Sequence, residues 1–246
     1  MLPDALEALH QRCGEGVIYL NPTVRNPTAQ SMPEHRRKDL LVTAARLKLK
    51  IIEDDPYWLF TDDAPAPFAS LMPQQVYYLS TLSKCISPGL RSAFLLLPSP
   101  AERSSFLEAL RALSLMSQPL MGALVTQWIL DGTAAQLQAA IAKESRERLY
   151  VANQILSASG CPTSGGGIHV WQRLPEHWNA DSLVSTAHAE GLVVAPSSAF
   201  CQGNDVTNAI RISLGGCKRR AELTASLRKL AKIFERNVTT VRPLLV

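Results

Sequence analysis

The sequence predicts an α/β protein with a smaller α+β domain at its C-terminal end. The chain has 246 residues, of which 46% are hydrophobic and 19% charged, as in an ordinary globular protein with room for one large or two small domains. A strand-like run, a helical pattern and a second strand-like run follow one another before residue 54. Short strand-like runs alternate with amphipathic segments again after residue 165. These observations favour a parallel sheet followed by a second, mixed domain.

The first three elements form a strand–helix–strand unit. Strands are expected at 16–20 and 49–53, two short apolar runs, and a helix at 34–47, where apolar residues recur at helical spacing. Ser31 and Glu34 have the spacing of a capping box, which predicts the start of that helix. Such a unit is right-handed in nearly all proteins, so the two strands are expected to be parallel neighbours.

Two further strands complete the predicted first sheet. Residues 76–80 and 92–97 are apolar runs separated by a loop at 83–90. The pattern then becomes helical over 100–132, and a longer amphipathic helix is expected over 133–159. The first sheet therefore has four expected strands.

The C-terminal part alternates short strands and helices. Strands are expected at 168–174, 192–195 and 209–213, and helices at 181–191 and 218–237. This alternation is typical of a small α+β domain packed on a larger one.

Composition excludes several classes of protein. No apolar run approaches the roughly 20 residues that span a bilayer, and the N-terminus lacks the regions of a signal peptide. The five cysteines are scattered without metal-ligand spacing, which favours free thiols in a reducing cytoplasm and no metal site. The net charge is +4, and the basic clusters at 36–38 and 218–220 are interpreted as helix ends or solvated faces. Membrane insertion, export and DNA binding by this chain alone are therefore not expected.

Polar residues follow the expected strands at the ends where chemistry is usual in an open α/β sheet. Asn26 follows the first strand, Asp54 and Tyr57 the second, and Lys84 and Arg91 the third. We expect them to share one crevice. These residue types suit pyridoxal 5'-phosphate: a lysine amine condenses with its aldehyde, and a carboxylate keeps its ring nitrogen protonated.

Five segments carry a resemblance to a known family: Leu-Asn-Pro-Thr-Val-Arg-Asn-Pro-Thr (20–28), Glu-Asp-Asp-Pro-Tyr (53–57), Thr-Leu-Ser-Lys through Gly-Leu-Arg (81–91), Gly-Gly-Ile-His (166–169) and Ala-Ile-Arg-Ile-Ser (209–213). In order and spacing they cover nearly the whole chain. The chain resembles the fold-type I, class I/II aminotransferases, and most closely the aminotransferase-like domain of MocR-type (GntR-family) transcription regulators.

The resemblance implies the aspartate aminotransferase fold. Residues 1–135 would be the C-terminal part of the large domain that binds pyridoxal phosphate, and residues 136–246 the small C-terminal domain. The first three strands would be parallel and the fourth antiparallel at one side. A boundary near 132–138 also fits the change of pattern along the chain.

The resemblance further implies which residues contact the cofactor ring. Asn26 and Tyr57 would hydrogen-bond the phenolic oxygen, and Asp54 would pair with the ring nitrogen. Lys84 would be the Schiff-base lysine and the proton shuttle.

It likewise implies three contacts with anionic groups. Thr81 and Arg91 would bind the cofactor phosphate. Arg211 would bind the substrate carboxylate, because a planar guanidinium matches a carboxylate in a bidentate way. An arginine in a short strand could instead make a structural salt bridge.

The family's domain begins with a segment that this chain does not match. There, a Gly/Ser-rich loop binds the phosphate and an aromatic side chain stacks on the ring; MocR-type regulators also carry an N-terminal winged-helix domain. The chain is therefore expected to be an N-terminally truncated form, and weakly active or inactive as a transaminase.

Three functions stay open. The chain could transfer an amino group between an amino acid and a 2-oxo acid. It could be a non-catalytic module that senses pyridoxal phosphate or an amino acid for a transcription regulator. It could also be an inactive remnant. A homodimer is expected, because one sheet edge is left open, and the chain would associate through that edge or through the dimer interface that the resemblance implies.

Overall fold

The computed structural model describes residues 1–157, 163–202 and 207–236. Contacts divide the chain into two compact units, one formed by residues 1–25 and 31–142 and the other by residues 26–30 and 143–246. The division lies a few residues after the boundary expected near 132–138, and it assigns residues 26–30 to the second unit. That these units correspond to the two expected functional domains stays a prediction.

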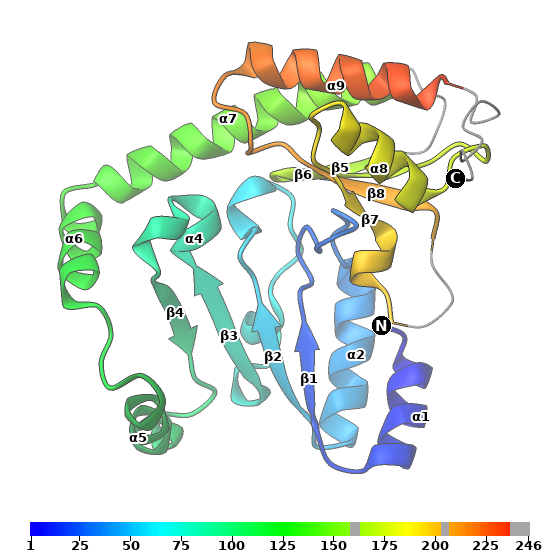
Figure 1. Ribbon diagram of the computed structural model, residues 1–246. Helices are drawn as coiled ribbons and strands as arrows, with labels where there is room; N and C mark the ends of the chain where they lie inside the picture. The colour runs from blue at the N-terminus through cyan, green and yellow to red at the C-terminus, as the bar shows by residue number, and fades with distance from the viewer. Residues whose placement is uncertain (158–162, 203–206, 237–246) are drawn as a thin grey trace. The chain divides into compact units, whose positions relative to one another are not determined.

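The first unit contains a four-stranded sheet in the order β1-β2-β3-β4 (Figure 1). Its strands are β1 (Val17–Leu20), β2 (Lys50–Asp54), β3 (Val76–Thr81) and β4 (Ala93–Leu96). β1, β2 and β3 are parallel, and β4 is antiparallel to β3. The expected topology is confirmed, with strand limits within a few residues of those expected.

Helix α2 (Glu34–Arg46) packs on this sheet through residues that recur at helical spacing. Its core cluster joins Leu40 and Ala44 of the helix to Ile18 and Ile51 of the strands. The expected capping box is wrong: Pro33 is the N-cap and provides no side-chain bond. The Ser31 hydroxyl instead accepts a hydrogen bond from the amide of Val24 at 3.0 Å, so it is bonded to the loop after β1 and not to the helix.

Helix α1 (Pro3–Cys13) was not expected from the sequence. A proline in its first turn, an acidic residue after it and Leu6 buried in the core are its local signals. The chain between the strands also forms short elements: η1 (Trp58–Phe60), α3 (Phe68–Leu71), η2 (Pro73–Gln75), α4 (Leu82–Cys85) and η3 (Pro88–Leu90).

The helical region after β4 is broken into separate elements: η4 (Pro100–Glu102), α5 (Arg103–Ser114), α6 (Pro119–Leu130) and α7 (Thr133–Leu156). Leu115 ends α5 with a φ of 55°, and Pro119 begins α6. Val125 of α6 packs against Leu82 and Leu90, which gives the region around α4 its own small core.

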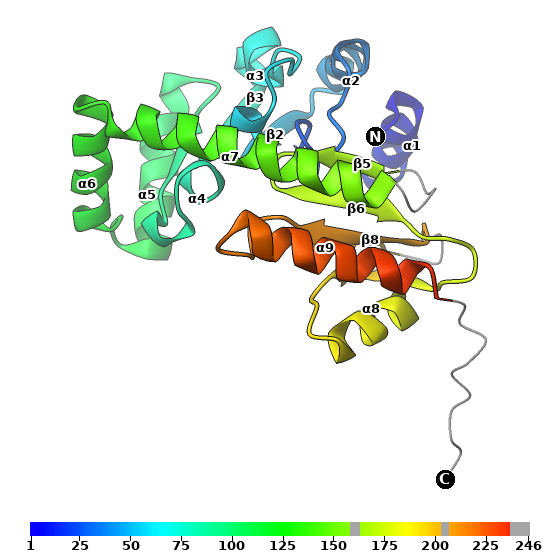
Figure 2. The ribbon, with the colours of Figure 1, turned by 90° about the horizontal axis from the view of Figure 1, so that it is seen from above.

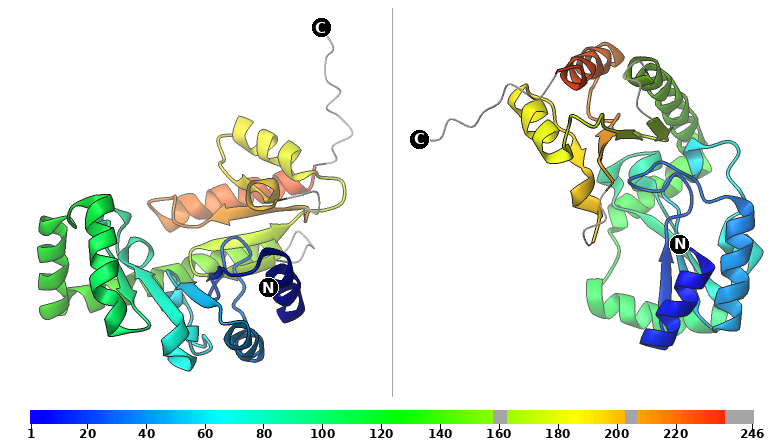
Figure 3. Two further views of the ribbon diagram at one scale, coloured as in Figure 1. Left: turned by 90° about the horizontal axis from the view of Figure 1, so that it is seen from below. Right: turned by 90° about the vertical axis from the view of Figure 1, so that its right-hand side faces the viewer.

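The second unit contains an antiparallel sheet in the order β5-β6-β8-β7. Its strands are β5 (Thr163–Gly166), β6 (His169–Arg173), β7 (Ala195–Pro196) and β8 (Ala209–Ser213). Helices α8 (Ala180–Ala189) and α9 (Arg220–Phe234) lie beside these strands (Figures 2 and 3). They share one apolar core with β6, β8 and the C-terminal part of α7.

One expectation for this unit is confirmed and one is corrected. The strand expected at 168–174 is present as β6, and it forms a hairpin with β5 whose turn includes Gly167 at a φ of 56°. The expected strand at 192–195 is wrong except at Ala195, which pairs with Arg211. The amide of Leu192 instead bonds the carbonyl of Ala187 at 2.9 Å and so closes the end of α8.

Parts of other expectations lie outside the described residues, namely residues 158–159 of the long helix, residue 237 of the last helix and Cys161. The other four cysteines are free thiols. Among the described residues, no helix combines the length and the apolar character that a bilayer crossing requires.

The basic clusters lie at helix ends, as interpreted from the sequence, but Arg37 is not part of a solvated face: it is fully buried. Lys38 pairs with Glu34 on the same helix at 2.6 Å. In the second unit, Arg219 pairs with Glu222 at 2.9 Å and Arg220 with Glu144 at 3.3 Å.

Candidate functional site

The end of β2 sends consecutive carboxylates to opposite faces of the sheet. Glu53 and Asp55 are buried, whereas Asp54 between them is half-buried on the other face. The Asp54 backbone carbonyl accepts a hydrogen bond from the Asn21 side chain at 2.7 Å. Its Oδ2 accepts one from the hydroxyl of Tyr19. Asp54 is therefore a carboxylate held at both its backbone and its side chain.

Tyr57 lies three residues beyond Asp54, at the start of η1. Only 7% of its surface is exposed, and its ring lies 6.4 Å from that of Phe60. The packed ring restricts the position that the Tyr57 hydroxyl can take.

The end of β3 carries hydroxyl groups next to a lysine. Thr81 is the N-cap of α4: its Oγ1 accepts a hydrogen bond from the amide of Ser83 at 3.1 Å. Lys84 follows on the same short helix and is exposed. Because β2 and β3 are parallel, with Asp54 opposite Leu79, Asp54 and Thr81 lie at the same end of the sheet. The carboxylate, the hydroxyls and the lysine thus belong to one edge.

Arg91 is brought to this edge by the return of the chain into β4. The amide of Leu82 and the hydroxyl of Thr81 both donate to the carbonyl of Ser92, at 3.1 and 3.3 Å. Arg91 precedes Ser92 and has a φ of 48°. Such a left-handed backbone is uncommon outside glycine and directs the chain sharply at this position.

The groups at this edge fit the cofactor expected from the sequence. Within the described residues, neither Lys84 nor Arg91 makes an ion pair with a carboxylate. Arg91 and the Thr81 and Ser83 hydroxyls suit a phosphate, the Lys84 amine suits an aldehyde, and the Asp54 carboxylate suits a protonated ring nitrogen. The donor set therefore matches the charges of pyridoxal phosphate.

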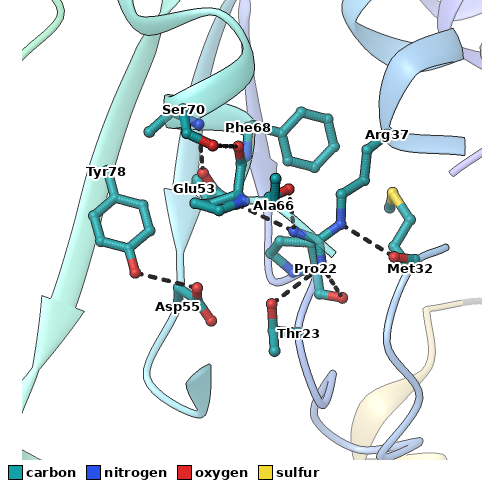
Figure 4. A network of polar contacts seen from close by, with 12 residues as sticks. Pro22, Thr23, Met32, Arg37, Glu53, Asp55, Ala66, Phe68, Ser70 and Tyr78 are labelled. Carbon is teal, nitrogen blue, oxygen red and sulfur yellow. Dashed lines mark hydrogen bonds and ion pairs between the residues drawn. The ribbon is translucent and has the colours of Figure 1, made fainter. Parts of the chain in front are cut away.

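A buried polar network supports the opposite face of β2 (Figure 4). Arg37 and Glu53 are both 0% exposed, and their closest charged atoms are 3.8 Å apart. The Glu53 carboxylate accepts the amides of Phe68 and Ala69 at 3.0 and 2.9 Å. Burial raises the pKa of Glu53, and these amide bonds and Arg37 oppose that rise. Two amide donors and a guanidinium therefore offset part of the cost of burying the Glu53 carboxylate.

The Arg37 guanidinium is satisfied by main-chain acceptors. It donates to the carbonyls of Met32 and Ala66, each at 3.1 Å, and to the hydroxyl of Thr23 at 3.1 Å (Figure 4). A guanidinium has donors in a fixed fork, so it can join several chain segments at once. Arg37 thereby ties the loop after β1 and the loop before α3 to α2.

Asp55 completes the network at the end of β2. Its Oδ2 accepts a hydrogen bond from the hydroxyl of Tyr78 at 3.2 Å. Burial raises the pKa of Asp55, and burial together with the charge of Asp55 raises the pKa of Tyr78. The network fixes the backbone from which Asp54 projects.

Arg211 and Asn26 meet in the second unit. Ile210 and Ile212 point into the apolar core, so Arg211 between them projects from the other face of β8. Its Nη1 donates to Asn26 Oδ1 at 2.7 Å, and its guanidinium lies 4.8 Å from the centre of the Phe200 ring. Its Nε is buried and has no hydrogen-bond partner among the described residues. A guanidinium that is fixed by two contacts and has a further N–H donor can bind an anion.

Two other residues occupy packing positions. His169 is 4% exposed in β6. Cys85, beside Lys84, is 2% exposed, and burial raises the pKa of its thiol. Neither position indicates a catalytic group.

Sequence reasoning did not single out Tyr19, Arg37 or Phe200. Tyr19 had a signal, since strand alternation places it on the face opposite the buried Ile18 and Leu20. Arg37 also had a positional signal, since helical spacing places it on the same face as Leu40 and Ala44, but its charge gave no reason to expect burial.

No protein-family model matches the chain. It is 27% identical to the uncharacterised HTH-type transcriptional regulator YdeF of Bacillus subtilis, over 96% of this chain and 51% of that protein. It is also 27% identical to the 2-aminoadipate transaminase of Thermus thermophilus, over 94% of this chain and 60% of that protein. The chain thus spans about half to three fifths of the length of these relatives.

The fold is also that of solved aminotransferases. LysN of Thermus thermophilus, an α-aminoadipate aminotransferase complexed with N-(5'-phosphopyridoxyl)-L-leucine, superposes with a TM-score of 0.82 at 26% identity, over 94% of this chain and 61% of LysN. The multiple substrate aminotransferase of Thermococcus profundus has a TM-score of 0.85 at 23% identity, over 97% of this chain and 61% of its own, and shows the fold alone. The chain has the aspartate aminotransferase fold (fold type I) and is related by sequence both to transaminases and to HTH-type transcriptional regulators.

Proposed function

We propose that this domain binds pyridoxal phosphate through Lys84 and acts on the amino group of an amino acid, with a 2-oxo acid as the partner substrate. The observation that carries the proposal is that Lys84 and Arg91, which make no ion pair with a carboxylate among the described residues, belong to the edge where Thr81 ends β3 and Asp54 ends β2. The transaminase relatives support the same reading.

Each residue at the edge of the first sheet has a task in this proposal. Asp54 holds a proton on the ring nitrogen; at about 4 Å and an effective dielectric near 20, such an ion pair has a Coulomb energy of order 4 kcal/mol. Tyr57 donates to the phenolic oxygen, and Thr81 and Arg91 bind the phosphate. The bound cofactor would supply a sink for the electrons of the Cα–H bond. Lys84 holds the cofactor and moves the proton.

Two residues of the second unit also have proposed roles. Asn26 is proposed to hydrogen-bond the phenolic oxygen. Arg211 is proposed to bind the substrate carboxylate. The unpartnered Nε of Arg211, together with its anchoring by Asn26 and Phe200, supports this role.

The 246 residues are proposed to transaminate slowly or not at all by themselves. In this proposal the phosphate is bound by the Thr81 hydroxyl and by Arg91, whereas the resemblance assigns a glycine-rich loop to the phosphate site of the family. Misplacement of reacting atoms by about 1 Å costs on the order of 100-fold in rate. Turnover near 1 s⁻¹ in coupled assays with a panel of amino acids and 2-oxo acids, a typical enzyme rate, would contradict this proposal.

A sensing role is the second candidate. Three relatives are HTH-type transcriptional regulators, which favours a module that reports an amino acid or the cofactor. In that case the chain would bind cofactor without turnover. An inactive remnant would do neither. The basic clusters are engaged in internal ion pairs, which supports the absence of DNA binding by these residues.

The decisive experiment is cofactor titration followed by borohydride reduction and peptide mapping. We expect a new absorbance band and a label on Lys84. Lys84→Ala should lose both, whereas Lys38→Ala, which removes an exposed lysine of α2, should retain them. Label on another lysine, or equal labelling of Lys84→Ala, would overturn the assignment.

Self-association as a homodimer is also proposed. Large apolar side chains are exposed on β4, α5 and α6 and on the loops that flank α5: Phe94, Leu96, Leu113, Leu115, Met116, Leu120 and Leu130. The free thiols support a reducing, cytoplasmic setting. A monodisperse monomer by light scattering at high concentration would contradict the dimer.

A further inference from the structure

Tyr19 lies on the exposed face of β1, next to the candidate site. In the parallel register Tyr19 pairs with Ile52, so Asp54 is its diagonal neighbour on the same face of β2. The Tyr19 hydroxyl donates a hydrogen bond to Oδ2 of Asp54. Tyr19 is 59% exposed and stands apart from the core cluster that contains its neighbours Ile18 and Leu20. Its defined contact is therefore with the carboxylate.

We infer that Tyr19 is a positioning residue for the cofactor's ring nitrogen: its hydroxyl holds Oδ2 of Asp54 and leaves Oδ1 as the oxygen that meets the ring. This inference rests on the proposed function. Asn21 fixes the backbone carbonyl of Asp54, and Tyr19 fixes its carboxylate. An aspartate held at both ends loses less rotational freedom when it binds the ring, so the cofactor binds more tightly.

The hydroxyl of Tyr19 keeps its proton near neutral pH and can act as a hydrogen-bond donor there. Burial of the hydroxyl, its bond to Asp54 and the nearby Asp54 and Tyr57 raise the pKa of Tyr19 to about 12. A neutral phenol keeps its proton, so the Tyr19 hydroxyl can donate to the Asp54 carboxylate.

The first test compares two tyrosine variants in cofactor titrations. Tyr19→Phe removes the bond to Asp54, and Tyr77→Phe removes a bond of the same kind, to Glu102, in the same sheet. We expect Tyr19→Phe to weaken pyridoxal phosphate binding about tenfold, as for a hydrogen bond to a charged group, and Tyr77→Phe to leave it within about twofold.

The analogue in which carbon replaces the ring nitrogen separates positioning from general damage. It offers Asp54 no proton to bind, so Tyr19→Phe and the wild type should bind it equally. Equal losses with both cofactors, or no difference between Tyr19→Phe and Tyr77→Phe, would overturn the inference. A wild type that carries no label on Lys84 overturns the proposed function as well, whereas normal labelling with an indifferent Tyr19→Phe overturns this inference alone.

A second measurement needs no cofactor. With tyrosine labelled at Cζ with ¹³C, the signal lost in Tyr19→Phe identifies Tyr19 in NMR spectra. We expect the pKa of Tyr19 to lie well above the ordinary value of 10.0, and Asp54→Asn to lower it. A pKa of Tyr19 that is the same in the wild type and in Asp54→Asn would show that the bond does not form in solution.

Discussion

Replacing Arg37 by methionine should strongly destabilise the first unit. Arg37 and Glu53 are both 0% exposed, and the guanidinium also donates to Met32, Ala66 and Thr23. Methionine fills much of the volume but leaves the Glu53 carboxylate buried without its cation. Breaking a buried pair in this way typically costs about 3–5 kcal/mol, a large part of the roughly 5–15 kcal/mol that holds a domain folded.

Urea denaturation measures this loss. If the unfolding free energy falls by about 3 kcal/mol per M urea, the unfolding midpoint of Arg37→Met should be about 1 to 2 M lower than that of the wild type. Lys38→Met is the matched control: its partner Glu34 is on the same helix and both side chains are about 60% exposed, so its cost should stay below about 1 kcal/mol. In Arg37→Met/Glu53→Gln, part of the loss should be recovered, because no buried charge is left unpaired.

The loss of stability in Arg37→Met should also depend on pH. Burial raises the pKa of Glu53, and removing Arg37 takes away one of the groups that oppose the rise. A carboxyl whose folded pKa lies above its unfolded pKa loses stability as the pH rises between the two, so the deficit of Arg37→Met should be largest near neutral pH and shrink toward about pH 4 to 5. A deficit below about 1 kcal/mol at neutral pH, or one that grows on acidification, would refute this reasoning.

Other predictions concern single positions. Because the pKa of Tyr78 is raised, the urea midpoint of the wild type should fall as the pH rises above about 10. The midpoint of Tyr78→Phe should fall less, and an equal fall in both proteins would contradict this prediction. Gly122→Ala, on an exposed turn of α6 with nothing within 4 Å of the added Cβ, should raise the unfolding free energy by about 0.5–1 kcal/mol, and a decrease would count against the helix. Leu227→Ala, in the core of the second unit at 2% exposure, should cost about 2–5 kcal/mol by the same assay. Arg211→Lys should weaken binding of 2-oxo acids about tenfold or more in competition titrations, since a lysine cannot form the bidentate pair; unchanged affinity would remove Arg211 from the substrate site.

The sequence by itself determined the order and kind of most elements. The apolar runs at 16–20, 49–53 and 76–80 and the helical spacing over 34–47 are local periodicities, and each became the element that its period indicates. The resemblance also indicated the antiparallel β4 and singled out Asp54, Thr81, Lys84 and Arg91, because those residues lie at fixed offsets from strand ends.

Only the tertiary structure decided which partners the polar groups find. The contact of Tyr19 with Asp54 depends on the register of β1 against β2, and the burial of Arg37 depends on loops that the chain brings back from both sides. The expected strand at 192–195 was wrong for a similar reason: Leu192 bonds to α8 before it can pair with β8. Periodicity records which face of an element is apolar, whereas hydrogen bonds between distant segments depend on how those segments meet in the folded chain.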